Sequence, residues 1–270
     1  MAENTPERAW IRNYAAGDEK EVRFMLGQSQ MENLAFANNR LYFHPVTMAI
    51  WLATSAAFAQ WMGWLPPKPE HGLFGYVSLL PAVFSCAVPM MFFIDWCNRS
   101  SVEARTENTL RRPDMLDIPT YYARSPASGF FILQWGDKII GLAAVDASYN
   151  STNDTPLTKG VKLDAQQTKD LLTGKGTSKV VTIRHFFSEE GYRSAGIEED
   201  LIQNAIRKAF SDAKVQTIRV SVSPLKRTFI KCLRKSHFVE GESDGKLGPF
   251  GWEWRWYTLD REKWEAAAAR

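Results

Sequence analysis

The sequence predicts an α/β (α+β) domain into which a two-helix transmembrane hairpin is inserted. Segments with strand-like and helix-like patterns alternate along most of the 270 residues. This alternation is typical of a sheet with helices packed against it. Near the N-terminus, two apolar runs follow each other closely. Each approaches the roughly 20 residues that a helix needs to cross the hydrocarbon core of a bilayer.

The predicted hairpin consists of residues 46–65 and 73–94, joined by a proline-rich turn. Neither run contains a charged residue, and Gln60 is the only strongly polar side chain in them. Aromatic residues lie near the ends of both runs, as anchors at a membrane interface do. Pro81 and Pro89 interrupt the second run, so a full crossing and a re-entrant loop are both open. A buried helical hairpin in a soluble protein is a further alternative.

The distribution of basic residues predicts which side of the membrane the rest of the chain occupies. Arginines lie outside the two runs, mainly between Arg99 and Arg112, whereas the connecting turn offers only Lys68. Basic residues prefer the cytosolic side, so both termini are expected in the cytosol. The glycosylation triplets that begin at Asn98, Asn150 and Asn153 should then stay unmodified.

Composition excludes some classes of protein. The net charge of +3 and the pI of about 8.7 fall short of the basic excess of a nucleic-acid-binding protein. The N-terminal residues are polar and lack the apolar core of a signal peptide. Cys86, Cys97 and Cys232 show no CxxC spacing. We therefore expect free thiols in a reducing setting, with neither a disulfide framework nor a metal site.

Periodicity and turn residues predict the remaining elements. Expected strands are 10–14, 129–134, 139–146, 179–187, 215–222 and 252–259, and expected helical segments are 17–35, 101–112, 164–172, 201–212 and 224–235. Four segments follow: an N-terminal strand and helix (1–45), the membrane hairpin (46–94), the rest of the α/β domain (95–262) and an alanine-rich tail (263–270). We expect the end of this tail to be frayed.

One stretch, EEGYRSAGIEEDLIQNAIRKAF (residues 189–210), follows a strand and opens a helix. Its Arg-x-x-Gly spacing resembles the acyl-CoA-binding segment of the GNAT N-acetyltransferases. The inserted hairpin is similar to that of membrane-anchored acetyltransferases that act on cysteine conjugates. This resemblance implies a GNAT-like fold. It also implies that Arg193, Ser194, Ala195 and Gly196, together with strand 181–186, hold acetyl-CoA if the chain retains that cofactor. Backbone N–H groups and the helix dipole would receive its pyrophosphate.

The chain departs from that family at the positions that bind the cofactor and protonate the leaving group in the family. Glu198 stands in place of a small residue, and Glu199 and Asp200 follow it. Each close contact between like charges costs roughly 2–4 kcal/mol at an effective dielectric near 20. The same acids can instead complement the helix dipole. Leu233 replaces the tyrosine that in the family protonates the leaving thiolate, and His237 replaces a glycine. The sequence therefore predicts no catalytic residue, no metal and no cofactor.

A closer resemblance covers most of the chain. FILQWGDKIIGLAAV, followed by IRHFF and YRSAGIEEDLIQNAIRKA behind a membrane hairpin, resembles the fungal ER-resident packaging factors of the high-affinity inorganic phosphate transporter. This resemblance implies a non-catalytic chaperone or cargo-exit factor in the endoplasmic reticulum membrane. Its client would be a multi-spanning phosphate transporter, and further partners would be COPII coat components and membrane lipid.

Two other functions stay open. The first is a membrane-anchored N-acetyltransferase that transfers acetyl from acetyl-CoA to an amine. The second is a transporter subunit, although two spans without an intramembrane charge give little support for an ion pathway.

Overall fold

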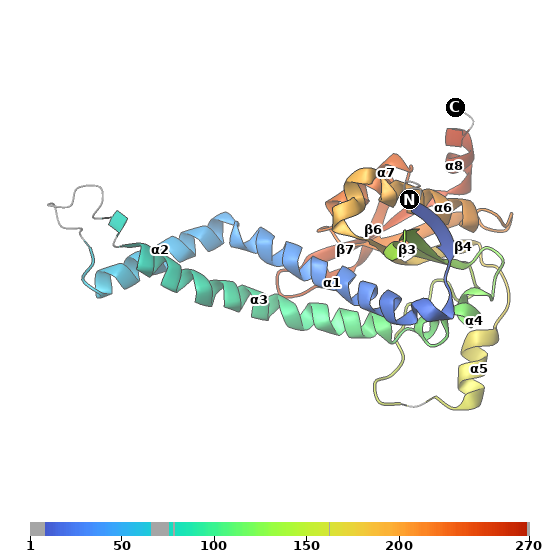
Figure 1. Cartoon of the computed structure of the whole chain (residues 1–270), viewed down its shortest axis with the longest axis horizontal. Coiled ribbons are helices and arrows are strands. Elements are labelled where there is room, and N and C mark those ends of the chain that lie inside the picture. Colours follow the sequence, from blue (N-terminus) through green and yellow to red (C-terminus); the bar gives the residue numbers. More distant parts are fainter. Residues whose placement is uncertain (1–8, 66–75, 78, 162, 269–270) are drawn as a thin grey trace, which may run out of the picture. The chain divides into compact units, whose positions relative to one another are not determined.

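The structure is a computed structural model that describes residues 9–65, 76–77, 79–161 and 163–268. Figure 1 shows the course of the chain. The helices are α1 (Glu19–Tyr42), α2 (Pro45–Trp61), α3 (Leu80–Leu110), α4 (Ile118–Tyr122), α5 (Ala165–Thr173), α6 (Ile197–Ala209), α7 (Arg227–Lys235) and α8 (Arg261–Ala268). The strands are β1 (Ala9–Asn13), β2 (Gly129–Trp135), β3 (Lys138–Asp146), β4 (Val180–Ser188), β5 (Thr217–Val222), β6 (Val239–Leu247) and β7 (Trp252–Asp260). Short 3-10 helices are η1 (Ala16–Asp18), η3 (Pro113–Met115) and η4 (Glu190–Ala195).

The described residues divide between two compact units. The first comprises Met1–Gln30, Ala104–Leu247 and Gly251–Arg270, and the second comprises Met31–Glu103 and Gly248–Phe250. The first unit contains the sheet, and the second contains α2 with the adjoining parts of α1 and α3. The predicted α/β domain with an inserted helical region is confirmed at this level.

The first unit is built on a seven-stranded mixed sheet with the order β1-β2-β3-β4-β5-β7-β6. β4 and β5 run parallel, and the other neighbouring strands of the described sheet run antiparallel. The hairpin of β2 and β3 was predicted from its two apolar runs and the intervening turn. β6 was not predicted, because it is polar and almost wholly exposed along its length.

Helices cover both faces of this sheet (Figure 1). On one face, apolar residues of α6 and α7, including Ile202, Ile206 and Phe229, pack on strand residues such as Val181 and Ile218. On the other face, the first turns of α1 join η3 and α4 around Phe187 of β4. β4 contributes apolar residues to the clusters on both faces of the sheet and therefore lies between them.

A bulge in β4 changes which side chains reach which face. The register between β3 and β4 shifts at Ala144, which pairs with His185, and Val145, which pairs with Ile183. Arg184 is the extra residue. A bulge of this kind lets two consecutive side chains point to the same side of a sheet. Arg184 and His185 therefore both face η3 and α4, where Asp114 and Tyr121 lie.

The second unit consists mainly of long apolar helices. α3 is long and apolar enough to cross a membrane, with a mean hydropathy of 1.6 over its most apolar 18 residues, of which 11% are buried. α2 reaches that length only together with α1, from which it is bent by 61°. The break falls at His44, whose Nδ1 accepts a hydrogen bond from the N–H of Val46. The described residues therefore contain one or two candidate membrane-spanning helices.

Several predicted boundaries need correction. The second apolar helix begins at Leu80 and continues without a break to Leu110, so the expected separate helix at 101–112 is its last part. Pro81 lies in its first turn, where proline is tolerated, and Pro89 lies inside it. The predicted turn at 66–72 lies outside the described residues. At the C-terminus, the segment expected to fray contains α8, and Trp264 stacks on Phe210 there with ring centroids 5.0 Å apart.

Candidate functional site

The candidate site lies where β4 and β5 separate. The two strands pair in parallel from Val180–Thr217 to Ile183–Val220. Beyond that point, β4 continues along β3 to Ser188, whereas β5 continues along β7 to Val222. The bulge at Arg184 coincides with the end of the pairing. Two neighbouring strands thus part inside the sheet, which leaves room between them for side chains and for a cavity.

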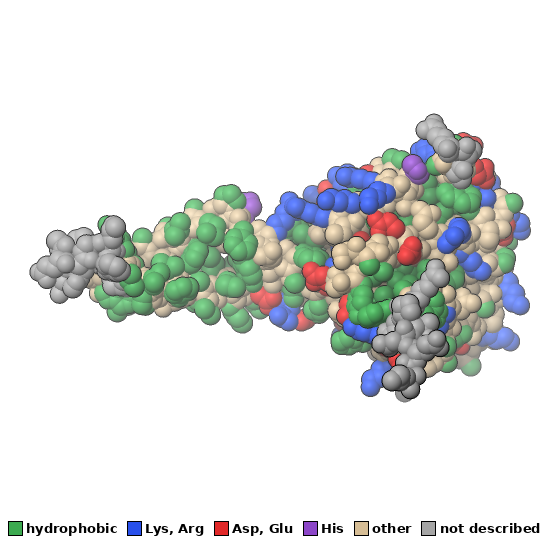
Figure 2. Space-filling view, turned by 45° about the horizontal axis from the view of Figure 1, so that its top comes forward, with side chains coloured by type: hydrophobic (Ala, Val, Ile, Leu, Met, Phe, Trp, Pro, Cys, Tyr) green, Lys and Arg blue, Asp and Glu red, His purple; other side chains and the backbone are tan. Residues whose placement is uncertain are grey.

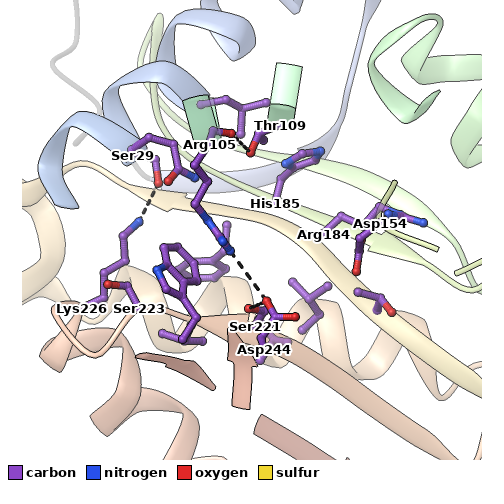
Figure 3. A pocket seen from close by; sticks show the side chains of 18 of the residues that line it. Ser29, Arg105, Thr109, Asp154, Arg184, His185, Ser221, Ser223, Lys226 and Asp244 are labelled. Atoms are coloured by element: carbon purple, nitrogen blue, oxygen red, sulfur yellow. Dashed lines mark hydrogen bonds and ion pairs between the residues drawn. The ribbon is translucent and has the colours of Figure 1, made fainter. Parts of the chain in front are cut away.

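The cavity at this opening has a volume of about 260 Å³. It is lined by residues of α1, α3, β4, β5, α7, β6 and β7 and by Asp154 from the long loop. Figure 3 shows its polar side chains converging from these elements. Every lining residue belongs to the first unit.

One wall of the cavity is aromatic. Trp254 and Trp256 alternate along β7 and both line the cavity. The guanidinium of Arg105 lies 3.5 Å from the ring centre of Trp254, and that of Arg219 lies 4.1 Å from the ring of Trp256. Both arrangements are cation–π contacts, and an indole is the preferred ring for such contacts. The alternating tryptophans of β7 thus position two arginines.

Arg105 carries the least compensated charge of this wall. Its Nη2 lies 3.8 Å from Oδ2 of Asp244, which also accepts a hydrogen bond from Oγ of Ser221. Burial lowers the pKa of Arg105 to about 10, although Asp244 opposes that shift. Arg105 is therefore still a cation at neutral pH, and burial disfavours its charged form.

Arg184 belongs to an ion network that is buried except at Asp154. Its Nε donates to Oδ2 of Asp146 at 2.7 Å, and its Nη1 donates to Oδ1 of Asp154 at 2.7 Å. The side chains of Arg184 and Asp146 are each 1% exposed. The hydroxyl of Tyr121 adds a hydrogen bond of 3.2 Å to Asp146. Since each charge has an opposite partner, the network holds the bulge in place and carries no evident reactive group.

His185 is paired on the same face. Its Nε2 lies 2.6 Å from Oδ2 of Asp114, which also accepts a hydrogen bond from the hydroxyl of Tyr122 at 2.8 Å. Burial would raise the pKa of Asp114, but His185 and Arg184 hold it well below the usual value. The sequence left open which face His185 occupies. It points into the core that contains Phe130, with ring centroids 6.4 Å apart.

On the opposite face of the opening, two phenylalanine rings close the gap. Phe186 of β4 and Phe229 of α7 stack with ring centroids 4.0 Å apart and an angle of 18° between their planes. Both residues line the cavity. The stack therefore forms the apolar end of the cavity between β4 and α7.

The residues predicted to hold acetyl-CoA, 193–196, lie together, but hydrogen-bond donors of Arg193 and Gly196 bond to other groups of the chain. Arg193 donates from Nε and Nη2 to the carbonyl oxygen of Ser188, at 3.1 and 2.7 Å. Ser194 and Ala195 are exposed residues of η4. The N–H of Gly196 donates to the carbonyl of Arg193 at 3.2 Å. None of these four residues is among the described residues that line the cavity.

Gly196 separates η4 from α6. It has φ +80°, which places it in the left-handed region that glycine adopts without strain. A side chain built there would meet only Oε2 of Glu199, at 3.9 Å. The glycine is therefore required by the backbone turn and not by a close approach of other parts of the chain.

Glu198 is the acid that faces inward. It is 6% exposed, and its Oε1 accepts a hydrogen bond of 2.8 Å from the hydroxyl of Ser188. Nε of Arg193 lies 3.6 Å from the same oxygen. Burial raises the pKa of Glu198, although Ser188 and Arg193 oppose the shift. A carboxylate of the chain thus occupies the first turn of α6, next to the positive end of its dipole.

The other two acids point away. Glu199 pairs with Lys235 of α7 at 3.1 Å, and Asp200 is exposed. Of the three carboxylates expected around a pyrophosphate, only that of Glu198 faces inward. That one is buried, and Arg193 is turned toward it. With these contacts, the residues present do not fit a doubly anionic pyrophosphate. The assignment of acetyl-CoA to residues 193–196 stays a prediction.

The later helix, α7, brings the cation Lys235 to Glu199 but contains no tyrosine. Leu233 is fully buried in the core with Phe229. Its neighbour Cys232 is also buried, and burial raises the pKa of its thiol to about 12. His237, which stands where the family has glycine, is exposed and has φ +64°. It keeps the left-handed turn of a glycine position without the glycine.

Sequence reasoning named strand 181–186, of which residues 182–186 line the cavity, but it missed the lining residues of the other elements. Arg105 was read only as a charge flanking the membrane, and the strand WEWRWYTL was given no role. The alternation of three tryptophans at 252, 254 and 256 with Glu253 and Arg255 is a signal for one aromatic face on a strand. The arginines that stack on that face lie on α3 and β5, and no local pattern connects these segments.

Comparisons with known proteins find distant structural similarity only. No family model matches the chain, and no curated protein sequence matches it. Among solved structures, an acetyltransferase of the GNAT family from Streptococcus pneumoniae is 11% identical, with 94% of this chain and 99% of that chain covered and a TM-score of 0.45. The aminoglycoside acetyltransferase AAC(6')-Ib in complex with coenzyme A is 13% identical, with 97% and 99% covered and a TM-score of 0.43. Both similarities are distant.

Proposed function

We propose that the chain is a non-catalytic chaperone and cargo-exit factor of the endoplasmic reticulum membrane. Its client is a multi-spanning inorganic phosphate transporter, which it helps to fold and to enter COPII vesicles. The client and the compartment rest on the resemblance to the fungal packaging factors. The observation that carries the non-catalytic part is Glu198. A buried carboxylate at the start of α6, bonded to Ser188, stands where an acetyltransferase would receive the pyrophosphate of its cofactor.

The helices of the second unit support a role with a membrane-embedded client. Figure 2 shows hydrophobic side chains gathered over α2 and α3. Large exposed apolar residues there are Val46, Ile50, Leu52, Trp61, Phe84, Val88, Met91, Phe92 and Phe93. An apolar surface of this extent is a liability in water and suits contact with lipid or with other transmembrane helices.

Gln60 gives this surface one polar contact point. Its side chain is exposed on α2, so it can hydrogen-bond to a helix of another protein. Such a bond contributes about 0.6–2 kcal/mol between membrane helices. Thr54, also exposed on α2, donates instead to the carbonyls of Ile50 and Trp51 in its own helix. The two positions form a matched pair for testing client contact.

The alternative function, acetyl transfer to an amine, has less support. The cavity presents four cationic side chains and two carboxylates, and a protonated amine would be repelled by that excess. Leu233 and Cys232 provide no group that titrates near neutral pH.

The proposal is tested by following the phosphate transporter in fungal cells that lack this protein. The transporter should be retained in the endoplasmic reticulum, and the full chain should restore its arrival at the plasma membrane. Glu198→Gln should restore it as well, because no reaction depends on the carboxylate. Gln60→Leu should restore it less than Thr54→Val. Normal transporter delivery in the absence of the protein would contradict the proposal.

A further inference from the structure

We propose that the exposed face of α7 binds the anionic headgroups of the membrane that holds this chain. This basic face consists of Arg227, Lys231, Arg234 and Lys235. The inference adds a lipid contact of the first unit to the proposed function. It rests on the membrane attachment proposed above, and it needs neither the transporter client nor the absence of catalysis.

α7 is an amphipathic helix whose two sides differ sharply. Phe229, Cys232 and Leu233 are buried in the core of the first unit. The four residues of the basic face are all exposed, and three of them follow Arg227 at spacings of four, seven and eight residues. Residues with these spacings lie on one side of an α-helix. The apolar side of α7 is therefore covered by the core, and its basic side faces solvent.

Half of the basic face is paired with acids of neighbouring elements. Nη2 of Arg234 lies 2.9 Å from Oε2 of Glu240 on β6. Nζ of Lys235 lies 3.1 Å from Oε1 of Glu199 on α6. The side chains of Arg234 and Lys235 are nevertheless 61% and 72% exposed. Ion pairs that are this exposed contribute little to stability, so both cations can exchange their partner for another anion at little cost.

The other half of the basic face is not compensated. Arg227 and Lys231 form no ion pair within the part of the chain that the structure describes, and α7 itself contains no Asp or Glu. Glu198, which acts on Cys232 of α7, is buried and lies 3.6 Å from Arg193, so it does not change this balance. Four cations against two paired carboxylates leave an excess of two positive charges on one short helix.

The shape of this surface indicates the kind of partner. The basic face is the outer side of a helix, and none of its four residues is among the described residues that line the cavity. Small anions bind in concavities where donors converge, whereas cations that all point outward suit an extended charged surface. The headgroup layer of an anionic bilayer is such a surface, and it attracts each nearby Lys or Arg.

The membrane anchor favours lipid over a soluble partner. α3 is apolar enough to cross a bilayer and continues without a break to Leu110, which belongs to the first unit. The first unit is thus tethered to the membrane, and its effective concentration at the lipid surface is high. Individually weak contacts then suffice. Each basic residue near an anionic cytosolic leaflet should strengthen the attachment about fivefold.

The test is the reactivity of lysines in the full chain reconstituted into nanodiscs. Discs of phosphatidylcholine are compared with discs that contain about 30% phosphatidylserine, and an uncharged amine reagent labels the protein. Lys231 and Lys235 should react about fivefold more slowly in the anionic discs. About 0.5 M salt should remove the difference, because it screens charge. Lys169 of α5, which is exposed, should react equally in both kinds of disc.

Three results would contradict the inference. Equal reactivity of Lys231 in both kinds of disc excludes the lipid contact. Protection by an added polyglutamate peptide in neutral discs, with none in anionic discs, would indicate an acidic protein segment as the partner. Failure of the chain to enter either kind of disc would contradict the membrane attachment as well, whereas equal reactivity in inserted protein contradicts the lipid contact alone.

Variants locate the contact on α7. Arg227→Gln combined with Lys231→Gln removes the two uncompensated charges. The reactivity of Lys235 in anionic discs should then come within about twofold of that in neutral discs. The matched control is Lys169→Gln combined with Lys175→Gln, which removes two exposed lysines that have no ion pair among the described residues. This control should leave the protection of Lys235 unchanged. Equal protection in the two double variants would overturn the inference.

Discussion

At the scale of single residues, Glu198 is the main departure of this chain from the acyl-CoA-binding pattern that its sequence resembles. Its carboxylate is held by Ser188 at 2.8 Å and lies 3.6 Å from Arg193. The loop and helix therefore satisfy one another without a ligand. An acid in the first turn of a helix is favoured by the dipole, and here the same acid fills the position that an external anion would need.

The buried position of Glu198 predicts a pH-dependent stability. Burial raises the pKa of this carboxyl in the folded state. Its contribution to stability is then fully present below the unfolded pKa of about 4.3 and is lost as pH rises through the folded value. Glu198→Gln should raise the thermal midpoint at pH 7, and this gain should vanish near the unfolded pKa.

The control for this measurement is Glu199→Gln. Glu199 is partly exposed and pairs with Lys235 at the surface, so its loss should change stability by about 1 kcal/mol or less at any pH. A lower midpoint for Glu198→Gln than for the unaltered protein at pH 7 would show that the folded state prefers the ionised carboxyl.

His237 predicts a stabilising substitution. Its φ of +64° is strained for a residue with a side chain and unstrained for glycine. The side chain is exposed, so little packing is lost on removal. Relief of this strain, roughly 1–2 kcal/mol, exceeds the cost of the greater freedom of glycine in the unfolded chain, about 0.4–1 kcal/mol. His237→Gly should therefore stabilise the protein by about 0.5–1 kcal/mol in chemical denaturation. His237→Ala retains the strain and should bring no gain; an equal gain for alanine would refute the strain argument.

The sequence was informative at this scale only where a residue departs from a local pattern. Glu198, Leu233 and His237 could be singled out because each breaks a family motif. Whether Glu198 points in or out could not be predicted, because its direction depends on Ser188 and Arg193 across the turn. The cation–π pair of Arg105 and Trp254 joins residues 149 positions apart, so no pattern predicts it.

At the scale of elements, β4 organises the site. Its bulge sends Arg184 and His185 to one face, and its early separation from β5 opens the cavity. The strand itself was predictable from its apolar run KVVTIRHFF. The bulge was not, since one inserted residue is visible only against the pairing partner β3. β6 escaped prediction because its polar sequence lacks the alternation that marks a half-buried strand.

The ion network at the bulge predicts a large loss on breaking one pair. Asp146→Ala would leave the buried guanidinium of Arg184 with Asp154 as its remaining close carboxylate. Removing one partner of a buried pair costs about 3–5 kcal/mol. Urea unfolding of the full chain in detergent should show a loss of that size.

The matched comparison is the double variant Asp146→Leu with Arg184→Met. Because it removes both charges and fills the space, it should recover most of the loss. A double variant as unstable as Asp146→Ala would show that the network stabilises the bulge through its hydrogen bonds rather than through charge compensation.

At the scale of the whole molecule, the apolar helices and the sheet-based unit call for different surroundings. α3 exposes Phe84, Val88 and Phe92, whereas the first unit buries its apolar residues in three clusters of its own. The apolar runs were predictable from composition, because hydropathy does not depend on tertiary contacts. The continuation of α3 into the polar residues 101–110 was harder to predict, because that polar part has the pattern of an independent helix.

The proposed topology predicts an absence of glycosylation. With both termini in the cytosol, Asn150 and Asn153 never meet the lumenal enzyme and should stay bare. Endoglycosidase treatment of the protein from fungal membranes should leave its mobility unchanged. A triplet placed in the connecting turn after Trp64 serves as the positive control. A mobility shift that depends on Asn150 or Asn153 would place the sheet-based unit in the lumen.

The claim that unites these scales is that a side chain of the chain itself, Glu198, occupies the loop and helix start that resemble an acyl-CoA-binding segment. Titration of the full chain in detergent with acetyl-CoA tests this directly, with Glu198→Gln alongside. The account predicts a Kd above about 1 mM for the unaltered protein, weaker than −4.1 kcal/mol. Low-micromolar binding that Arg193→Ala abolishes would contradict the account.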